Sequence, residues 1–318
     1  TVGFIGSGNY ATAVLIPAFK GANAELKSVA SSAGISSVHA GKKFGFAEVT
    51  TDSQEIIKDE LINTVVVTTR HNNHAQFVLD ALNAGKHVFV EKPLALKREE
   101  LGDITSAYEV ASKNETPLVM VGFNRRFSAH VKKIKQLLTG VSEPKSFIMT
   151  VNAGAIPADH WTQDKAVGGG RIIGEGCHFI DLLRFVAGAE IVSVQAVRMG
   201  EGVTIRDDKV TITLGFADGS FGTVHYLANG SKSFPKERLE VFCADRVLQL
   251  DNFRKLTGFG WPGFKKFKTS KQDKGQSACA AAFVDAIESG GESPIPFSEL
   301  IEVANATFDV VDILEGQG

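Results

Sequence analysis

The chain has 318 residues, of which 43% are hydrophobic and 22% are charged. This composition is typical of a folded globular protein, and the length predicts two domains, because a domain averages roughly 150 residues. Lys and Arg total 34 against 36 Asp and Glu, a net charge of −2. That balance excludes a global field that would draw the protein to nucleic acid or to an anionic membrane, so we expect neither as a partner.

No apolar run reaches the roughly 18 residues of a membrane span, and the first residues lack the charged head and cleavage site of a signal peptide. The three cysteines, Cys177, Cys243 and Cys279, lie far apart without CxxC spacing, which predicts neither a disulfide framework nor a cysteine zinc site. We therefore expect a cytoplasmic protein with reduced thiols. Because Thr1 opens directly into a strand-like run, we hypothesise that the chain is cut from a longer polypeptide.

The first 122 residues alternate short apolar runs with segments of helical length. Continuous apolar runs predict buried parallel strands covered by helices on both faces. Between them, residues 72–84 place Ala75, Val78, Leu79 and Leu82 at helical spacing, and Gly85 follows as a C-terminal cap. The predicted strands lie at 2–5, 25–31, 63–69, 86–91 and 117–122.

After residue 123 the pattern changes to helices followed by strands separated by turn residues, which predicts an antiparallel sheet. The expected fold class is therefore α/β, with a Rossmann doubly wound parallel sheet at 1–122 and an α+β domain with a large open antiparallel sheet at 123–318. The last helix is expected to pack back toward the first domain. Predicted helices lie at 129–138, 177–186, 278–288 and 298–314, and strands at 147–151, 191–198, 209–216, 221–227, 238–243 and 246–250.

A glycine-rich turn, Gly6-Ser7-Gly8-Asn9-Tyr10-Ala11, follows the first strand and opens a helix. Glycines at these positions allow a tight turn and close approach of the backbone to a diphosphate, which the free N–H groups of the helix start can bind. The turn therefore predicts a dinucleotide site, whereas a plain glycine turn is the alternative.

The second strand ends in Ser31 and Ser32, where a dinucleotide fold that selects NAD places an acid for the ribose. The two hydroxyls could bind a 2′-phosphate, and Lys42 or Lys43 could add charge, although surface positions explain all four equally well. We expect NAD or NADP as the cofactor, with a lean to NADP.

The run Glu91-Lys92-Pro93 follows the strand 86–91, at the end of the sheet where α/β proteins bind ligands. A lysine there can stabilise negative charge that develops on a substrate oxygen. Pro93 restricts Lys92 to extended angles and could hold the peptide cis. A solvated loop lysine is the alternative.

A second cluster, within 168–181, places His178 in the first turn of a helix and Asp181 three residues later on the same face. If Asp181 orients the ring, His178 can act as a general base near neutral pH, whereas a helix-start histidine beside a surface acid is the alternative. His71 and His74 lack a third ligand at recognisable spacing, so we predict no metal site and place them beside the cofactor.

Between Phe253 and Gly275 there are seven basic residues and one acid, interleaved with aromatic residues. This pattern resembles a nucleic-acid patch superficially. The glycines and proline of 258–263 favour a solvated loop, with a groove for an anionic substrate as the second choice.

These motifs together resemble the Gfo/Idh/MocA family of nicotinamide-dependent sugar and cyclitol oxidoreductases. The resemblance covers nearly the whole chain. It rests on segments 6–11, 68–74, 84–93, 122–127 and 168–181.

The resemblance implies that Lys92 is the catalytic lysine and His178 the general base, assisted by Asp181. It also implies a homo-oligomer formed through the open C-terminal sheet. The motifs and the resemblance together predict the cofactor contacts, which are Gly6, Gly8, Asn9, Tyr10, Ala11, Ser31, Ser32, Thr69, His71, His74, Glu91, Lys92 and Pro93. Substrate contacts are expected from Asn124, Arg125, Trp161 and Glu175.

Two departures concern the substrate. The family's acid four residues before the base is Gly174 here, with Glu175 adjacent, and its usual Pro-Asn is Arg70-His71. These changes resemble a subgroup fused behind a zinc-type medium-chain dehydrogenase. We predict hydride transfer between NAD(P) and a secondary carbinol or keto carbon of a sugar-like substrate, a class that includes nucleotide-linked sugars. A non-catalytic nucleotide-binding interaction module is the alternative.

Overall fold

The structure is a computed structural model that describes residues 1–113 and 116–316. The chain divides into two compact units, 1–123 with 276–304 and 124–275 with 305–318. The first boundary lies beside the one predicted at 122/123. The predicted second domain, 123–318, is wrong for residues 276–304, which belong to the first unit. The reason is that the helix at the start of this segment, Gln276–Ser289, packs against helix α1 of the first unit. The final two residues of that predicted domain lie outside the described part.

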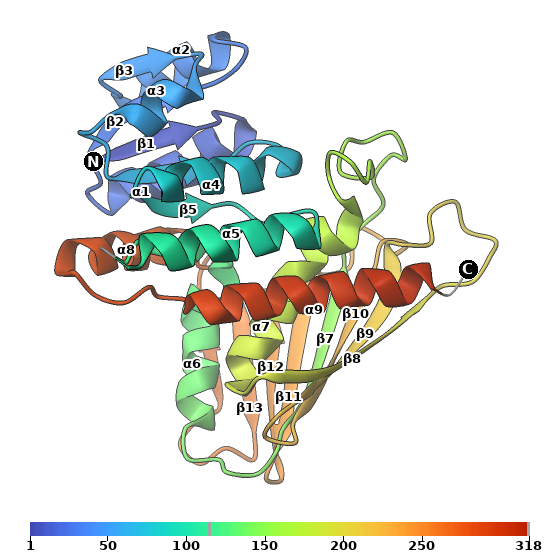
Figure 1. Cartoon of the computed structure of the whole chain (residues 1–318). Coiled ribbons are helices and arrows are strands. Elements are labelled where there is room, and N and C mark those ends of the chain that lie inside the picture. The colour runs from blue at the N-terminus through green and yellow to red at the C-terminus, as the bar shows by residue number, and fades with distance from the viewer. Residues whose placement is uncertain (114–115, 317–318) are drawn as a thin grey trace. The chain divides into compact units, whose positions relative to one another are not determined.

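The first unit is built on a six-stranded parallel sheet in the order β3-β2-β1-β4-β5-β6 (Figure 1). Every residue of β1 and β4 is buried, as expected for strands covered on both faces. The predicted doubly wound sheet is confirmed, and the short strand β3 is an addition to it. The strands are β1 Val2–Ile5, β2 Leu26–Ala30, β3 Glu48–Thr50, β4 Thr64–Val67, β5 His87–Val90 and β6 Val119–Val121.

The helix predicted over 72–84 is observed as α4, His74–Asn83, preceded by a 3₁₀ turn. Gly85 follows with a φ of 69°, the left-handed conformation expected after a helix C-terminus. The helix after the glycine-rich turn begins at Asn9 and contains a π-helical turn, Ala11–Leu15. The other helices of this unit are α1 Ile16–Gly21, α2 Ile35–Phe44, α3 Ser53–Lys58, α5 Arg98–Ala111 and α8 Gln276–Ser289, while α9 Phe297–Glu315 runs from the first unit into the second.

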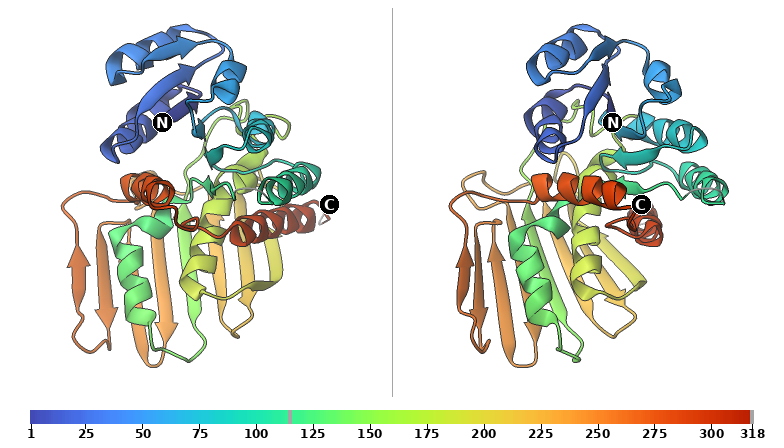
Figure 2. Two further views of the ribbon diagram at one scale, coloured as in Figure 1. Left: turned by 60° about the vertical axis from the view of Figure 1, so that its left-hand side comes forward. Right: turned by 90° about the vertical axis from the view of Figure 1, so that its left-hand side faces the viewer.

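The second unit is built on an eight-stranded sheet in the order β14-β13-β12-β11-β7-β10-β9-β8 (Figure 2). The predicted antiparallel pairing is found throughout except between β7 and β10, which run parallel, so the sheet is mixed. The strands are β7 Ser146–Asn152, β8 Ile191–Arg198, β9 Lys209–Phe216, β10 Phe221–Leu227, β11 Glu237–Cys243, β12 Arg246–Asp251, β13 Lys255–Phe259 and β14 Lys266–Lys268.

The basic stretch 253–275 was predicted as a solvated loop, and this is wrong in part, because it contains β13 and β14 at the edge of the sheet. Lys266 and Lys268 of β14 are exposed while Phe267 between them lies 5.0 Å from the His130 ring, centroid to centroid. Exposed lysines on an edge strand discourage pairing with another chain. The basic residues therefore have a structural explanation at this edge.

Two helices, α6 Ala129–Leu138 and α7 Cys177–Ala187, cover one face of this sheet (Figures 1 and 2). The strands alternate accordingly: Phe147, Met149 and Val151 of β7 are buried, while the intervening residues are only partly covered. Within 1–113 and 116–316, no helix has the length and apolar character needed to cross a membrane.

Candidate active site

The predicted cofactor residues of the first unit lie at one edge of its parallel sheet. The turns after β1, β2, β4 and β5 all begin where a strand ends, and parallel strands end at the same edge. This edge is where open α/β sheets bind ligands. The sequence-predicted cofactor residues of this unit lie on these four turns or on the helices that follow them.

The glycine-rich turn after β1 has the backbone geometry that a diphosphate needs. Gly6 has a φ of 106°, and an added Cβ would lie 2.7 Å from the carbonyl oxygen of Thr68. At Gly8 an added Cβ would meet no atom within 4 Å, so the backbone there faces open space. Asn9 and Tyr10 begin the helix, and both are exposed. The turn therefore presents bare backbone and a helix start to a ligand.

A chain of three hydroxyl groups joins the turn after β1, the turn after β2 and the first turn of α2. The Ser7 Oγ donates to Ser36 Oγ at 2.9 Å, and Ser36 Oγ lies 2.6 Å from Ser31 Oγ. Ser32 beside them is exposed. Lys42 and Lys43 lie in the last turn of α2, whose first turn is at this edge. A helix rises 1.5 Å per residue, so the backbone of these lysines stands roughly 10 Å farther along, and the charge that they could add stays a prediction.

His74 is fully buried at the start of α4 and joins two of the turns. Its Nδ1 lies 2.7 Å from the Pro93 carbonyl oxygen and its Nε2 lies 3.2 Å from the Thr69 carbonyl oxygen. Burial lowers its pKa, which favours the neutral ring. Because the His74 side chain has no exposed surface, it holds the two turns together and does not itself offer a contact to a cofactor. His71 is also buried, with its ring centroid 5.6 Å from that of His74.

The Glu91-Lys92-Pro93 turn follows β5 directly, as predicted, and the Lys92–Pro93 peptide is cis. Glu91 is buried against Gly122, where an added Cβ would lie 2.5 Å from Glu91 Oε1. Lys92 remains partly exposed. The turn therefore holds the Glu91 carboxylate inward, whereas Lys92 keeps part of its surface exposed.

In the second unit, His178 lies in the first turn of α7, as predicted, and is largely buried. Asp181 is fully buried, and its carboxylate accepts hydrogen bonds from Arg126 Nε at 2.8 and 2.9 Å and pairs with Nη2 at 2.6 Å. The i, i+3 spacing from His178 did not predict this ion pair. Asp181 thus joins α7 to the turn Asn124–Phe127, the segment that also carries Arg126.

Glu175 lies in a π-helical turn, Ile172–Gly176, and accepts from three side chains. The donors are Tyr226 Oη at 2.5 Å, Lys236 Nζ at 2.6 Å and Arg171 Nη2 at 2.7 Å. Burial alone would raise the pKa of the Glu175 carboxyl, but Lys236, Tyr226 and Arg171 hold it well below its ordinary value. Burial and the negative charge of Glu175 raise the pKa of Tyr226, which keeps the hydroxyl as a donor.

Asn124 and Arg125, predicted to face nicotinamide or substrate, make contacts inside the second unit. The Asn124 side chain donates to the Lys274 carbonyl oxygen at 2.6 Å, and Arg125 donates twice to Glu237, at 2.8 and 2.9 Å. Lys274 Nζ donates to the same carboxylate at 2.6 Å. Burial opposes the charge on Glu237, but Arg125 and Lys274 outweigh it and lower the pKa of Glu237 to about 2.

The partners of these carboxylates were missed by sequence reasoning. Tyr226 and Lys236 are 51 and 61 residues from Glu175, and Glu237 is 112 residues from Arg125. Only the Arg171–Glu175 pair, at i and i+4, carries a local signal. Trp161 is half-buried on the loop that precedes the π-helical turn. Across 1–113 and 116–316, no group of three or more His, Cys, Asp or Glu side chains could hold a metal ion.

Two family models match the chain. Residues 1–123 match the model described as "Oxidoreductase family, NAD-binding Rossmann fold", and residues 139–249 match the "GFO/IDH/MocA C-terminal domain". The two matched segments lie on either side of the boundary at 123/124.

Curated relatives and solved structures agree with these models. The chain is 27% identical to myo-inositol 2-dehydrogenase of Thermotoga maritima over 225 residues, which is 68% of this chain and 64% of that protein. It is 29% identical to levoglucosan dehydrogenase of Pseudarthrobacter phenanthrenivorans, over 60% of this chain and 55% of that protein. The matches thus span less than two thirds of either relative.

A solved structure of levoglucosan dehydrogenase in complex with NADH and levoglucosan superimposes with a TM-score of 0.87, 25% identity, and coverage of 100% of this chain and 97% of that one. Another was solved with NADH alone. None of these relatives is described as fused to a zinc-type dehydrogenase, and their NADH gives no support to the lean toward NADP.

Proposed function

The chain belongs to the GFO/IDH/MocA family of NAD-binding oxidoreductases, and on that premise we propose that it transfers a hydride between NAD(H) and a secondary carbinol or keto carbon of a sugar-like substrate. The observation that carries the proposal is the edge of the parallel sheet, where the bare glycine turn follows β1 and the partly exposed Lys92 follows β5, the two strands that flank β4. The names of the relatives, inositol and levoglucosan dehydrogenases, support a polyol or anhydro-sugar as substrate.

The residues of the first unit suit a dinucleotide. The open space beside Gly8 admits a diphosphate to the backbone, and the helix that starts at Asn9 offers N–H groups to it. The hydroxyls of Ser31 and Ser36 stand where the ribose of a dinucleotide is held in this kind of fold. When bound, the nicotinamide would accept or supply the hydride.

In this proposal Lys92 and His178 are the two catalytic side chains. In the oxidation direction, His178 takes the O–H proton as the carbinol carbon loses its hydride and the carbonyl forms. The Lys92 ammonium stabilises the negative charge that develops on the oxygen. Glu175 and Asp181, whose carboxylates are held by other side chains, are positioning residues near the start of α7.

Single variants test these roles. Lys92→Ala and His178→Ala should each lower turnover by roughly 10² to 10⁴, the usual contribution of general acid–base catalysis, while NADH still binds. The assay follows NADH formation with levoglucosan, myo-inositol and L-sorbose as candidate substrates. Unchanged turnover in both variants would refute the assigned roles.

The double variant tests whether the two side chains serve the same oxygen. Residues that act as one unit are strongly non-additive, so Lys92→Ala/His178→Ala should lose about as much as the worse single variant. Losses that multiply would instead indicate separate functions.

The alternative, a non-catalytic nucleotide-binding module, is favoured by one observation. Gly174 stands where the family has an acid, and the adjacent Glu175 is already held by three donors. NADH binding without turnover across a broad panel of sugars and nucleotide sugars would select this alternative.

The proposed cofactor is NAD(H). The turn after β2 offers hydroxyl groups to a ribose, and Lys42 and Lys43 lie at the other end of α2, in its last turn. Dissociation constants for NADH and NADPH, measured side by side by fluorescence titration, test this choice. A clear preference for NADPH would contradict it.

The open face of the eight-stranded sheet supports a homo-oligomer. Phe221, Phe242 and Phe259 are between 39 and 52% exposed and lie in one row, because Ser146 pairs with both Phe221 and Phe242, and Val247 pairs with both Phe242 and Phe259. A second copy that covers this row would bury three aromatic rings. Sedimentation of wild type and Phe242→Asp tests the idea, since a monomer in both would contradict it.

The hypothesis that the chain is part of a longer fused polypeptide also stays a prediction. Intact-mass measurement of the native gene product tests it, and a mass close to the 34.0 kDa of this chain would contradict it.

A further inference from the structure

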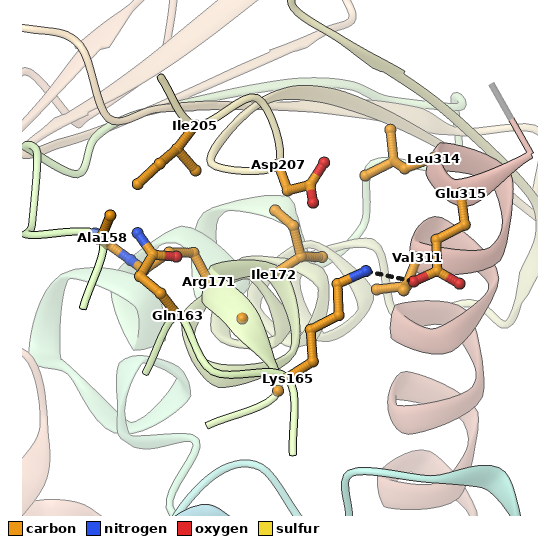
Figure 3. A pocket seen from close by; sticks show the side chains of 12 residues that line it. Ala158, Gln163, Lys165, Arg171, Ile172, Ile205, Asp207, Val311, Leu314 and Glu315 are labelled. Carbon is orange, nitrogen blue, oxygen red and sulfur yellow. Dashed lines mark hydrogen bonds and ion pairs between the residues drawn. The ribbon is translucent and has the colours of Figure 1, made fainter. Parts of the chain in front are cut away.

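A cavity of about 220 Å³ lies within the second unit (Figure 3). Three segments form it: the loop and helix start 158–172, the loop around Ile205 and Asp207, and the last turn of α9. We call it the α9 pocket. One water molecule needs only about 10–15 Å³ of such space, so the pocket has room for a ring-sized molecule.

Part of the lining of the α9 pocket is aliphatic. Ile172, Ile205, Val311 and Leu314 come from all three segments and line it together (Figure 3). Such a lining favours contact with the C–H groups of a ligand, because aliphatic side chains form no hydrogen bonds with water.

The pocket also contains a hydrogen-bond donor that lacks an acceptor. Gln163 lines the cavity, and its Nε2 atom is buried; among the residues that the structure describes, none accepts a hydrogen bond from it. Figure 3 shows the Gln163 amide between Ala158 and Arg171. A buried donor without a partner destabilises the folded chain, so an oxygen placed in the pocket would relieve that cost.

The charged groups of the pocket are already paired. Lys165 and Glu315 form an ion pair at 2.7 Å that joins the loop to α9, as Figure 3 shows. Arg171 pairs with Glu175 at 2.7 Å, and Asp207 pairs with Arg198 at 2.9 Å. A charged ligand would therefore have to compete with an existing partner, whereas a neutral ligand would not.

We propose that the α9 pocket binds a neutral, ring-sized oxygenated molecule. Its hydroxyl, ether or carbonyl oxygen accepts from Gln163 Nε2, and its C–H face packs on the four aliphatic side chains. The proposal does not rest on the proposed hydride transfer, because the residues assigned to that reaction do not line the pocket. Arg171 connects the two regions, since it lines the pocket and also holds Glu175.

The probe for this site is trans-1,2-cyclohexanediol, titrated into the full chain and followed by saturation-transfer NMR. Leu314→Trp should fill the pocket, and Gln163→Leu removes the donor at similar volume; each should weaken diol binding at least tenfold. Gln136→Leu, at an exposed glutamine of α6, is the matched control and should leave binding unchanged. Cyclohexanecarboxylate and cyclohexylammonium should bind at least tenfold more weakly than the diol.

Folding and location are tested with the same samples. Without the probe, Gln163→Leu should melt at or above the temperature of wild type, because it removes an unpaired buried donor. Ile205→Trp replaces Leu314→Trp if the latter does not fold. His178→Ala should bind the diol normally even if His178 proves essential for turnover.

Three results would overturn the proposal. They are the absence of saturable diol binding to the wild type, full affinity in both pocket variants, and a loss of affinity in His178→Ala but not in Leu314→Trp.

Discussion

The two units present their polar groups in opposite ways. In the first unit, backbone and short side chains lie open at one edge of a parallel sheet, and the Gly8 position faces free space. In the second unit, long charged side chains are buried and paired: Asp181 with Arg126, and Glu237 with Arg125 and Lys274. The first arrangement is suited to receive a ligand on the backbone. The second fixes the start of α7 and leaves few polar groups to rearrange.

The largest loss of stability is expected when Asp181 is replaced. Replacement by Ala leaves the Arg126 guanidinium buried without its carboxylate, which should lower the free energy of unfolding by about 3–5 kcal/mol. Urea denaturation measures the change. Asp207→Ala, which removes the half-exposed partner of Arg198, is the matched control and should cost about 1 kcal/mol or less. Equal losses would show that burial does not distinguish the two pairs.

The pH dependence of stability tests the Glu237 cluster. Because the pKa of Glu237 is about 2 in the folded chain against an ordinary 4.5, its contribution is present above pH 4.5 and is lost as the pH falls toward 2. The difference corresponds to about 3 kcal/mol. The free energy of unfolding, measured by urea titration across this range, should fall less steeply for Glu237→Gln. Identical slopes would contradict the argument.

Two glycines of the first unit, Gly6 and Gly8, differ in what a new Cβ would contact. Gly6→Ala should weaken NADH binding at least tenfold and also destabilise the unit, because its φ is 106° and the new Cβ would meet the Thr68 carbonyl oxygen. Gly8→Ala should weaken NADH binding but change the free energy of unfolding by less than about 0.5 kcal/mol, because no atom lies within 4 Å of the new Cβ. Calorimetric titration and urea denaturation measure both, and a stability loss at Gly8 equal to that at Gly6 would be inconsistent with an open turn.

The smallest effect is expected at Ser31. An acid there can bind a ribose hydroxyl and repels a 2′-phosphate, so Ser31→Asp should raise the preference for NADH over NADPH by about tenfold, or 1.4 kcal/mol. The ratio of the two dissociation constants reports the change. An unaltered ratio would place Ser31 away from the ribose.

The sequence was sufficient where the signal is local. The turn from Gly6 to Ala11, the position of Lys92 after β5 and the helix α4 are each defined by a few neighbouring residues, and the structure places them as predicted. Secondary structure and turn chemistry act over this range, so a single sequence contains the information.

The sequence was insufficient where distant segments meet. Nothing local to Glu175 indicates Tyr226 or Lys236, and nothing in β7 indicates that it pairs parallel to β10. The return of α8 to the first unit has the same cause. At the sheet edge, the glycines near Gly258 suggested a loop. The segment forms strand β13 because it pairs with β12, and a single sequence does not show that pairing.

The π-helical turn Ile172–Gly176 affects how residues of this chain are matched to those of its relatives. There the Cys177 N–H bonds to the Ile172 carbonyl, five residues back, so the helix accommodates one residue more than an ordinary turn. A relative's residue four positions before its base can therefore be matched in two ways. Matching by residue number gives Gly174, whereas matching by rotation around the helix axis gives a neighbour of Gly174. Superposition of side-chain directions, rather than residue spacing, is the sound basis for deciding which position in a relative corresponds to Glu175.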